Sequence, residues 1–103
     1  MAKSHRTHEE ATAEMFRRDP ELAAEYLNSV LRDGDEADLM LALRSLSKAF
    51  GGVGEIARQA DVNAHTLYRT LSEKGNPELK TLSAILRTMG MRLSIELIEH
   101  SHA

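Results

Sequence analysis

Residues 63–80 carry a series of side chains whose types and spacing suit contact with duplex DNA. An arginine can bond both major-groove acceptors of guanine, while asparagine, histidine and threonine can donate hydrogen bonds to bases or phosphates. Lysine and asparagine side chains at the edge of such a segment would hold the phosphate backbone without reading sequence. The candidate DNA contacts are Asn63, Ala64, His65, Thr66, Arg69, Lys74, Asn76 and Lys80.

Arg69 and His65 carry most of the predicted base recognition. They are four residues apart, about one helical turn, so both can face the same groove. Arg69 could instead pair with Glu73, and His65 could be an ordinary exposed histidine rather than a contact that strengthens on mild acidification. Asn63 and Thr66 are expected to serve as helix cap and phosphate contact rather than as base readers.

Four side chains near this segment are weaker candidates. Arg44, Lys48 and Arg58 could contact phosphates, but each could equally be a solvated residue on a helix surface. Tyr68 is expected to be half-buried, because recognition of a duplex needs no platform for unstacked bases.

The sequence contains no complete set of residues for a disulfide, a metal site, a phosphate-binding loop or an enzyme active site. The chain has no cysteine, which excludes disulfides, thiolate nucleophiles and cysteine-ligated metals. The histidine pairs at positions 5/8 and 100/102 lie near the chain ends without further ligands, so no metal is expected. The glycine-rich run 51–54 lacks the Gly-Lys-Ser/Thr of a phosphate-binding loop. We expect no catalytic residues, no cofactor and no enzymatic activity.

The composition indicates a helical scaffold for the candidate residues. The 103 residues, 42% hydrophobic and 28% charged, suit one compact domain. Aromatic residues make up only 4%, and the apolar content is mostly Leu, Ala, Ile and Met, which favour helices. Because no stretch approaches the roughly 18 consecutive apolar residues of a membrane span, we expect a cytoplasmic protein.

Capping residues and glycines divide the chain into five or six helices. Thr7 and Glu10 have capping-box spacing and begin a marginal first helix, with Ala11 and Met15 as its apolar pair. Asp19-Pro20 is a strong start signal for the second helix. The later helices are predicted over residues 20–33, 35–50, 53–60, 64–73 and 79–89. The third, over 35–50, is expected to bury the most apolar surface.

The two helices within residues 53–73 have the anatomy of a helix-turn-helix. Ile56 and the small Ala57 are expected to face inward, with Val62 in the turn and Leu67 in the second helix. The start of that second helix would enter the major groove. The predicted organisation is an arm over 1–18, a helical DNA-binding domain over 19–90, a strand over 91–99 and a tail over 100–103.

The C-terminal segment changes its hydrophobic period. Met91, Leu93, Ile95 and Leu97 alternate with polar residues, which predicts a single β-strand. A lone strand needs a partner for its backbone groups, so these four residues are candidates for dimerisation across a two-fold axis. Pairing with a strand of another protein, or a loosely packed tail, are the alternatives.

Charge is distributed unevenly along the chain. The net charge is −3, but residues 9–43 hold ten acidic and three basic side chains, whereas residues 44–92 hold eight basic and four acidic. A polyanion is therefore a plausible partner for the second half only. A net charge of about +4 neutralises few phosphates, which favours a dimer on two half-sites.

Residues 19–97 resemble the addiction-module antidote family, and residues 53–73 resemble the lambda-repressor-like, or Xre-type, helix-turn-helix. The resemblance rests on residues 55–60, 66–77 and 89–93. It implies a HigA-like antitoxin that binds its own operator as a homodimer, represses its own operon and neutralises a RelE/ParE-like toxin. It also favours a toxin-binding role for the acidic half, which could otherwise be a solvated face.

Two positions depart from the usual pattern of these repressors. Asp61 occupies a turn position where glycine is common, although aspartate tolerates left-handed backbone angles better than most residues. Ala64 is the first exposed position of the second helix and offers bases only an apolar contact.

Two other functions remain open. One is a stand-alone, prophage-type transcription regulator, which a neighbouring gene for a small basic protein would argue against. The other is a protein-interaction module that no longer binds DNA, in which case replacing Arg69 or His65 would leave function intact.

Overall fold

The computed structural model describes residues 7–72 and 75–99 of the chain. This part contains helices and no strand, which confirms the all-α prediction. The helices are α1 (His8–Arg18), α2 (Pro20–Asp33), α3 (Glu36–Ala49), α4 (Val53–Ala60), α5 (Ala64–Thr70) and α6 (Leu79–Thr88). None of these helices has the length and apolarity needed to cross a lipid bilayer.

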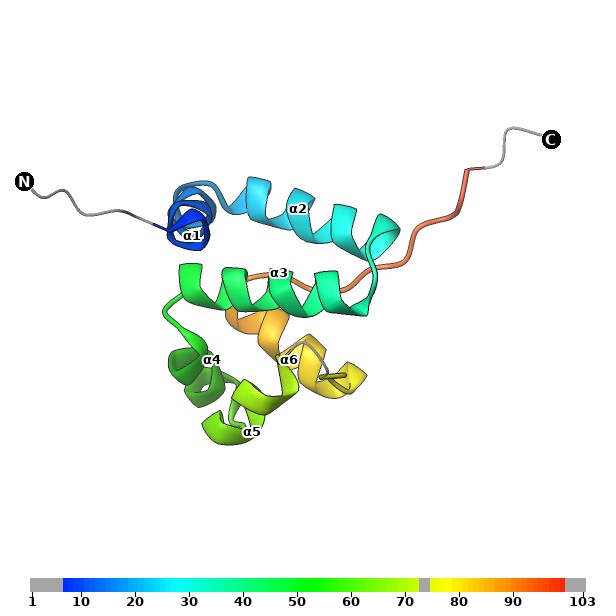
Figure 1. The fold of residues 1–103 in the computed structure, drawn as a ribbon. Coiled ribbons are helices and arrows are strands. Elements are labelled where there is room, and N and C mark those ends of the chain that lie inside the picture. Colours follow the sequence, from blue (N-terminus) through cyan, green and yellow to red (C-terminus); the bar gives the residue numbers. More distant parts are fainter. Residues whose placement is uncertain (1–6, 73–74, 100–103) are drawn as a thin grey trace, which may run out of the picture.

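Helix α3 lies at the centre of the molecule, with helices on both sides of it (Figure 1). It contacts α1 and α2 on one side and α4 on the other, and α4 in turn contacts α5 and α6. As predicted, it buries the most side chains of any helix. Its fully or almost fully buried apolar residues are Met40, Ala42, Leu43, Leu46 and Ala49.

The first three helices begin at side-chain caps, and the sequence predicts the caps of α1 and α2. Thr7 and Glu10 form a reciprocal capping box at the start of α1. The Asp19 side chain accepts from the Leu22 backbone N–H at 3.2 Å, directly before Pro20 at the first position of α2. Asp35 caps α3 in the same way, and its own N–H donates to Asp38.

Helix α1 is packed into the common core. Ala13 and Phe16 are buried, and the ring of Phe16 stacks on Tyr26 of α2 with 5.0 Å between centroids. Arg17 Nε donates to the backbone oxygen of Ala49 at 3.1 Å, which satisfies a carbonyl at the C-terminal end of α3. The sequence predicted Ala11 and Met15 as the apolar pair of this helix, and the prediction is wrong for Met15, which is exposed.

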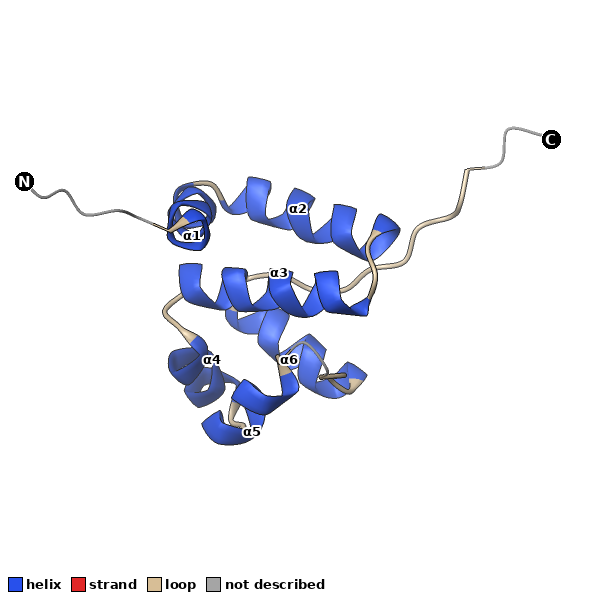
Figure 2. Ribbon diagram, viewed as in Figure 1, coloured by secondary structure: helices blue, strands red, loops and turns tan. Residues whose placement is uncertain are grey.

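The prediction of a C-terminal β-strand is wrong for this chain. Gly90, at φ +78°, ends α6, and the Met91 N–H donates back to the Leu86 carbonyl at 2.9 Å. From there residues 91–99 run as irregular chain (Figure 2). Within the described residues, no backbone hydrogen bond involves residues 92–99. A strand is defined by pairing with a neighbour, and the helical fold supplies none.

Candidate nucleic-acid interface

Helices α4 and α5 form a compact pair joined by three residues. Ile56 and Ala57 of α4 and Leu67 of α5 are buried, as predicted, and Leu71 directly after α5 is buried with them. Val62 in the turn is half-buried, and its N–H donates to the Ala57 carbonyl at 2.9 Å. These contacts hold α5 against the body on one face and leave its other face in solvent.

The turn has the backbone geometry that the sequence predicts. Asp61 adopts the left-handed conformation with φ 61° and ψ 46°. Asn63 follows in extended conformation and caps α5, because its Oδ1 accepts the Thr66 backbone N–H at 3.0 Å. Helix α5 is shorter than predicted, since it ends at Thr70 rather than at residue 73.

The candidate DNA contacts gather on the exposed side of this short helix. Asn63, Ala64, His65, Thr66 and Arg69 are all exposed, and no described residue forms an ion pair with Arg69. Two further candidates, Asn76 and Lys80, are exposed before and in the first turn of α6. Lys74 lies outside the described residues, as does Glu73, the predicted alternative partner of Arg69.

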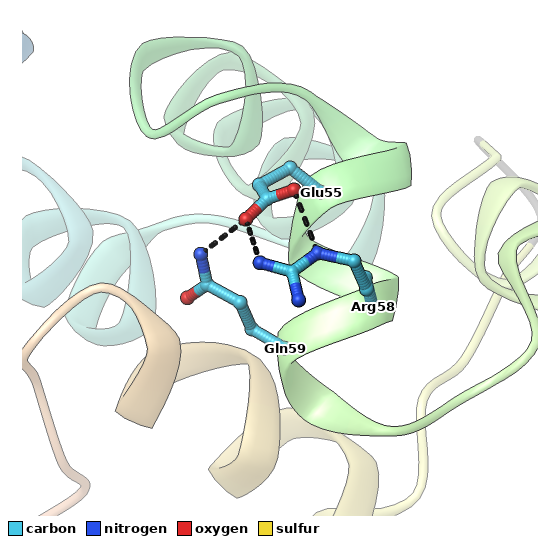
Figure 3. Close-up of polar contacts among 3 residues, drawn as sticks. All are labelled: Glu55, Arg58 and Gln59. Carbon is cyan, nitrogen blue, oxygen red and sulfur yellow. Dashed lines mark hydrogen bonds and ion pairs between the residues drawn. The ribbon is translucent and has the colours of Figure 1, made fainter.

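Arg58 is engaged within its own helix (Figure 3). Its Nε and Nη2 atoms donate to the two carboxylate oxygens of Glu55, at 3.0 and 2.5 Å, and the Gln59 amide donates to the same carboxylate at 2.6 Å. The hydrogen bonds from Arg58 and then Gln59 lower the pKa of Glu55 from 4.5 to about 2. The carboxylate of Glu55 partly neutralises the charge of Arg58, so Arg58 is less available to a phosphate than Arg69.

A hollow of about 250 Å³ lies between α3, the start of α4 and α5. Arg44 and Lys48 line it from α3, Gly52 and Val53 line it at the α4 N-terminus, and Tyr68 lines it from α5. Basic side chains next to a helix N-terminus form a suitable environment for an anion such as a phosphate. The sequence places Arg44 and Lys48 four residues apart, but only the tertiary fold brings them beside α5.

Tyr68 is a correction to the sequence prediction. Its side chain is 60% exposed and reaches the hollow, rather than being half-buried in the core. Leu67 and Leu71 already fill the inner face of this helix, so the neighbouring position is turned outward. Tyr68 is thus an exposed residue beside the candidate contacts that the sequence interpretation did not include among them.

The four candidate dimerisation residues divide into two pairs. Met91 and Leu93 are half-buried and pack on the chain's own core. Ile95 and Leu97 are 98% and 97% exposed. The structure therefore anchors the beginning of this segment on the body and presents its end to solvent.

The described residues contain no group of three His, Asp or Glu side chains arranged to hold a metal ion. The histidines at positions 5, 100 and 102 lie outside the described residues.

Comparison with known proteins gives the family of this chain. A relative from Haemophilus influenzae Rd, an uncharacterized protein, is 27% identical over 71 residues, which is 69% of this chain and 72% of that protein. No solved structure matches the chain. The model of a family described as probable addiction module antidote protein matches residues 8–97. Since this match spans nearly all of the described residues, the chain belongs to the family of probable addiction module antidote proteins.

Proposed function

We propose that this protein is a homodimeric antitoxin that binds its own operator through α4 and α5 and neutralises a toxin of the RelE/ParE kind. Family membership supports the antitoxin part, because an antidote implies a toxin partner. The DNA-binding part rests on one observation: α5 is anchored by Leu67 and presents a capped, polar and basic face to solvent. This is the arrangement by which an Xre-type helix-turn-helix enters the major groove.

The exposed residues divide into base readers and backbone contacts. Arg69 and His65 read bases from the outer face of α5, and the exposed Asn63 and Thr66 at its start contact the phosphate backbone. The hollow with Arg44 and Lys48 holds a further phosphate beside α5. The activity is binding alone, needs no cofactor, and takes place in the cytoplasm where the operator lies.

Two copies of the chain bind one operator. The basic half of one copy can neutralise only about four phosphates, which gives weak affinity at physiological salt. The exposed end of the C-terminal segment, with Ile95 and Leu97, is the proposed contact between copies. Two domains on half-sites about one helical turn apart then double the number of phosphate contacts.

The test is a fluorescence-anisotropy titration of the full chain against the DNA upstream of its gene and a scrambled duplex. We expect at least tenfold tighter binding to the upstream duplex. The logarithm of the association constant should fall with the logarithm of the salt concentration by roughly 0.9 per phosphate contacted. Arg69→Ala should weaken specific binding by about 1 to 3 kcal/mol and reduce discrimination between the two duplexes. Arg32→Ala is the matched control, because Arg32 is an exposed arginine on α2, which makes no contact with α5.

The results also separate the two alternative functions. Specific DNA binding without any toxin encoded nearby would favour a stand-alone regulator. Equal and weak binding to both duplexes, unchanged by Arg69→Ala, would overturn the DNA-binding proposal and favour a protein-interaction module.

A further inference from the structure

An open trough is lined by α1, α2 and α3, on the side of the molecule away from α5. It consists of two adjoining hollows, of about 630 and 330 Å³, which share Tyr26 of α2 and Leu41 of α3. Figure 1 shows α2 and α5 on opposite sides of α3, and α2 makes no contact with α5. The trough and the proposed DNA-binding face therefore lie on different sides of α3 and share one described lining residue, Arg44.

The middle of the trough presents an apolar side chain to solvent. Leu41 is 48% exposed, although the helix that carries it is the most deeply buried of the molecule. Ser45 lines the trough one turn further along and is only 6% exposed.

Charge makes the two ends of the trough different. Asp33 and Asp38 line one end, and Arg44 lies at the other. Asp33 is the last residue of α2, where the helix dipole disfavours a negative charge, and Asp35 and Glu36 follow within three residues. Asp35 and Asp38 stabilise α3 through its capping box, whereas Asp33 has no such role and would be stabilised by a cationic partner.

We propose that this trough is the docking surface for the toxin, which inserts an apolar side chain between Tyr26 and Leu41. The inserted segment is basic at the end that meets Asp33 and Asp38. The acidic excess of residues 9–43 complements a toxin that needs positive charge to bind RNA. This inference rests on the antidote function proposed above and names the surface that performs it.

Its position implies that toxin and operator bind at the same time. The trough lies between α2 and α3, whereas the operator would contact α5 on the other side of α3 (Figure 1). A ternary complex of antitoxin, toxin and DNA therefore requires no rearrangement of the helices, although both partners would approach Arg44, which lines the trough and the hollow beside α5.

The test measures binding of the full chain to the protein encoded by the reading frame beside its own gene, purified and titrated by calorimetry. Leu41→Arg should weaken that complex at least tenfold, because a charged side chain would fill the apolar middle of the trough. Leu79→Arg is the matched control, since Leu79 is 70% exposed on α6 and lines neither hollow. Circular dichroism melting establishes that both variants are folded.

A second variant tests the charge. Asp33→Asn should weaken the complex and reduce its dependence on salt, without lowering the melting temperature of the free chain. Loss of stability together with loss of binding would instead give Asp33 a structural role and count against the proposal.

The remaining outcomes distinguish this proposal from the function on which it rests. If the neighbouring protein does not bind the unaltered chain, the toxin-neutralising function itself fails. If it binds the unaltered chain and the Leu41→Arg variant equally, the function stands and the trough is not its site. A change in the oligomeric state with Leu41→Arg would show that a second copy occupies the trough, and a change in operator binding would assign it to DNA.

Discussion

Two arginines of the α4–α5 pair have different surroundings. Arg58 donates to Glu55 from the same helix, so its guanidinium is held along the surface of α4. Arg69 forms no ion pair with any described residue and extends from the exposed face of α5. Residue type alone gives both side chains the same ability to bind phosphate or guanine. Their local partners make Arg69 the better candidate.

Replacing Arg58 with alanine should raise the pKa of Glu55 from about 2 toward its ordinary value of 4.5, because the largest cause of the shift is the hydrogen bond from Arg58. The pKa of Glu55 is lower in the folded chain than in the unfolded one. The stabilisation of the fold by the ionised Glu55 is therefore fully present above pH 4.5 and is lost as the pH falls toward 2. An NMR titration of the Glu55 carboxyl carbon in both proteins measures this. Titration of Glu55 near pH 4.5 in the unaltered chain would contradict the hydrogen-bonded pair of Glu55 and Arg58.

At the scale of helices and turns, α5 depends on the short connection that precedes it. Asp61 adopts a left-handed backbone and Asn63 caps the helix, and α5 itself is only seven residues long. A helix this short is not stable alone, so its position comes from the turn, the cap and the burial of Leu67. The geometry of the candidate interface is therefore set by three residues that need not touch a base.

Asp61 provides the prediction at this scale. Asp61→Ala should destabilise the chain by about 1 to 2 kcal/mol, since alanine is strained at φ 61°, whereas Asp61→Gly should be close to neutral. Urea denaturation of the three proteins compares their free energies of unfolding. If the alanine and glycine variants were equally stable, the left-handed turn would not exist in solution.

At the scale of the whole molecule, α3 separates two surfaces of different character. On one side, α1 and α2 belong to the acidic half of the chain, and on the other, α4 to α6 belong to the basic half. The C-terminal segment packs back along α2 through Met91 and Leu93 and then leaves the body (Figure 1). The surfaces proposed for operator, toxin and a second copy thus lie on different sides of the molecule, and the first two share Arg44.

The exposed end of this segment gives the prediction for the assembly. Replacing Ile95 and Leu97 together with serine should leave the fold intact, because both side chains are almost fully exposed, but should convert a dimer into a monomer. Analytical ultracentrifugation reports the mass, and the melting temperature should lose its dependence on protein concentration. Ser94→Ala is the control within the same segment. A double variant that remains dimeric would place the dimer contact elsewhere.

Much of the fold was determined by short-range patterns in the sequence. Thr7, Asp19, Asp35 and Asn63 are caps whose partners lie only three residues away, so their role follows from spacing. The left-handed turn at Asp61 and the inward positions of Ile56 and Leu67 are equally local. The helices, their order and the exposed candidates on α5 are therefore predictable without coordinates.

Only the tertiary structure decided what depends on residues far apart in the chain. The face of α1 could not be read from its sparse apolar residues, because it is chosen by packing on α2 and α3 through Phe16. The C-terminal alternation predicted a strand, yet pairing needs a neighbour that a helical chain lacks. The hollows that Arg44 lines with Tyr68, and Tyr26 with Leu41, likewise depend on how the helices are placed relative to one another, which local sequence patterns do not encode.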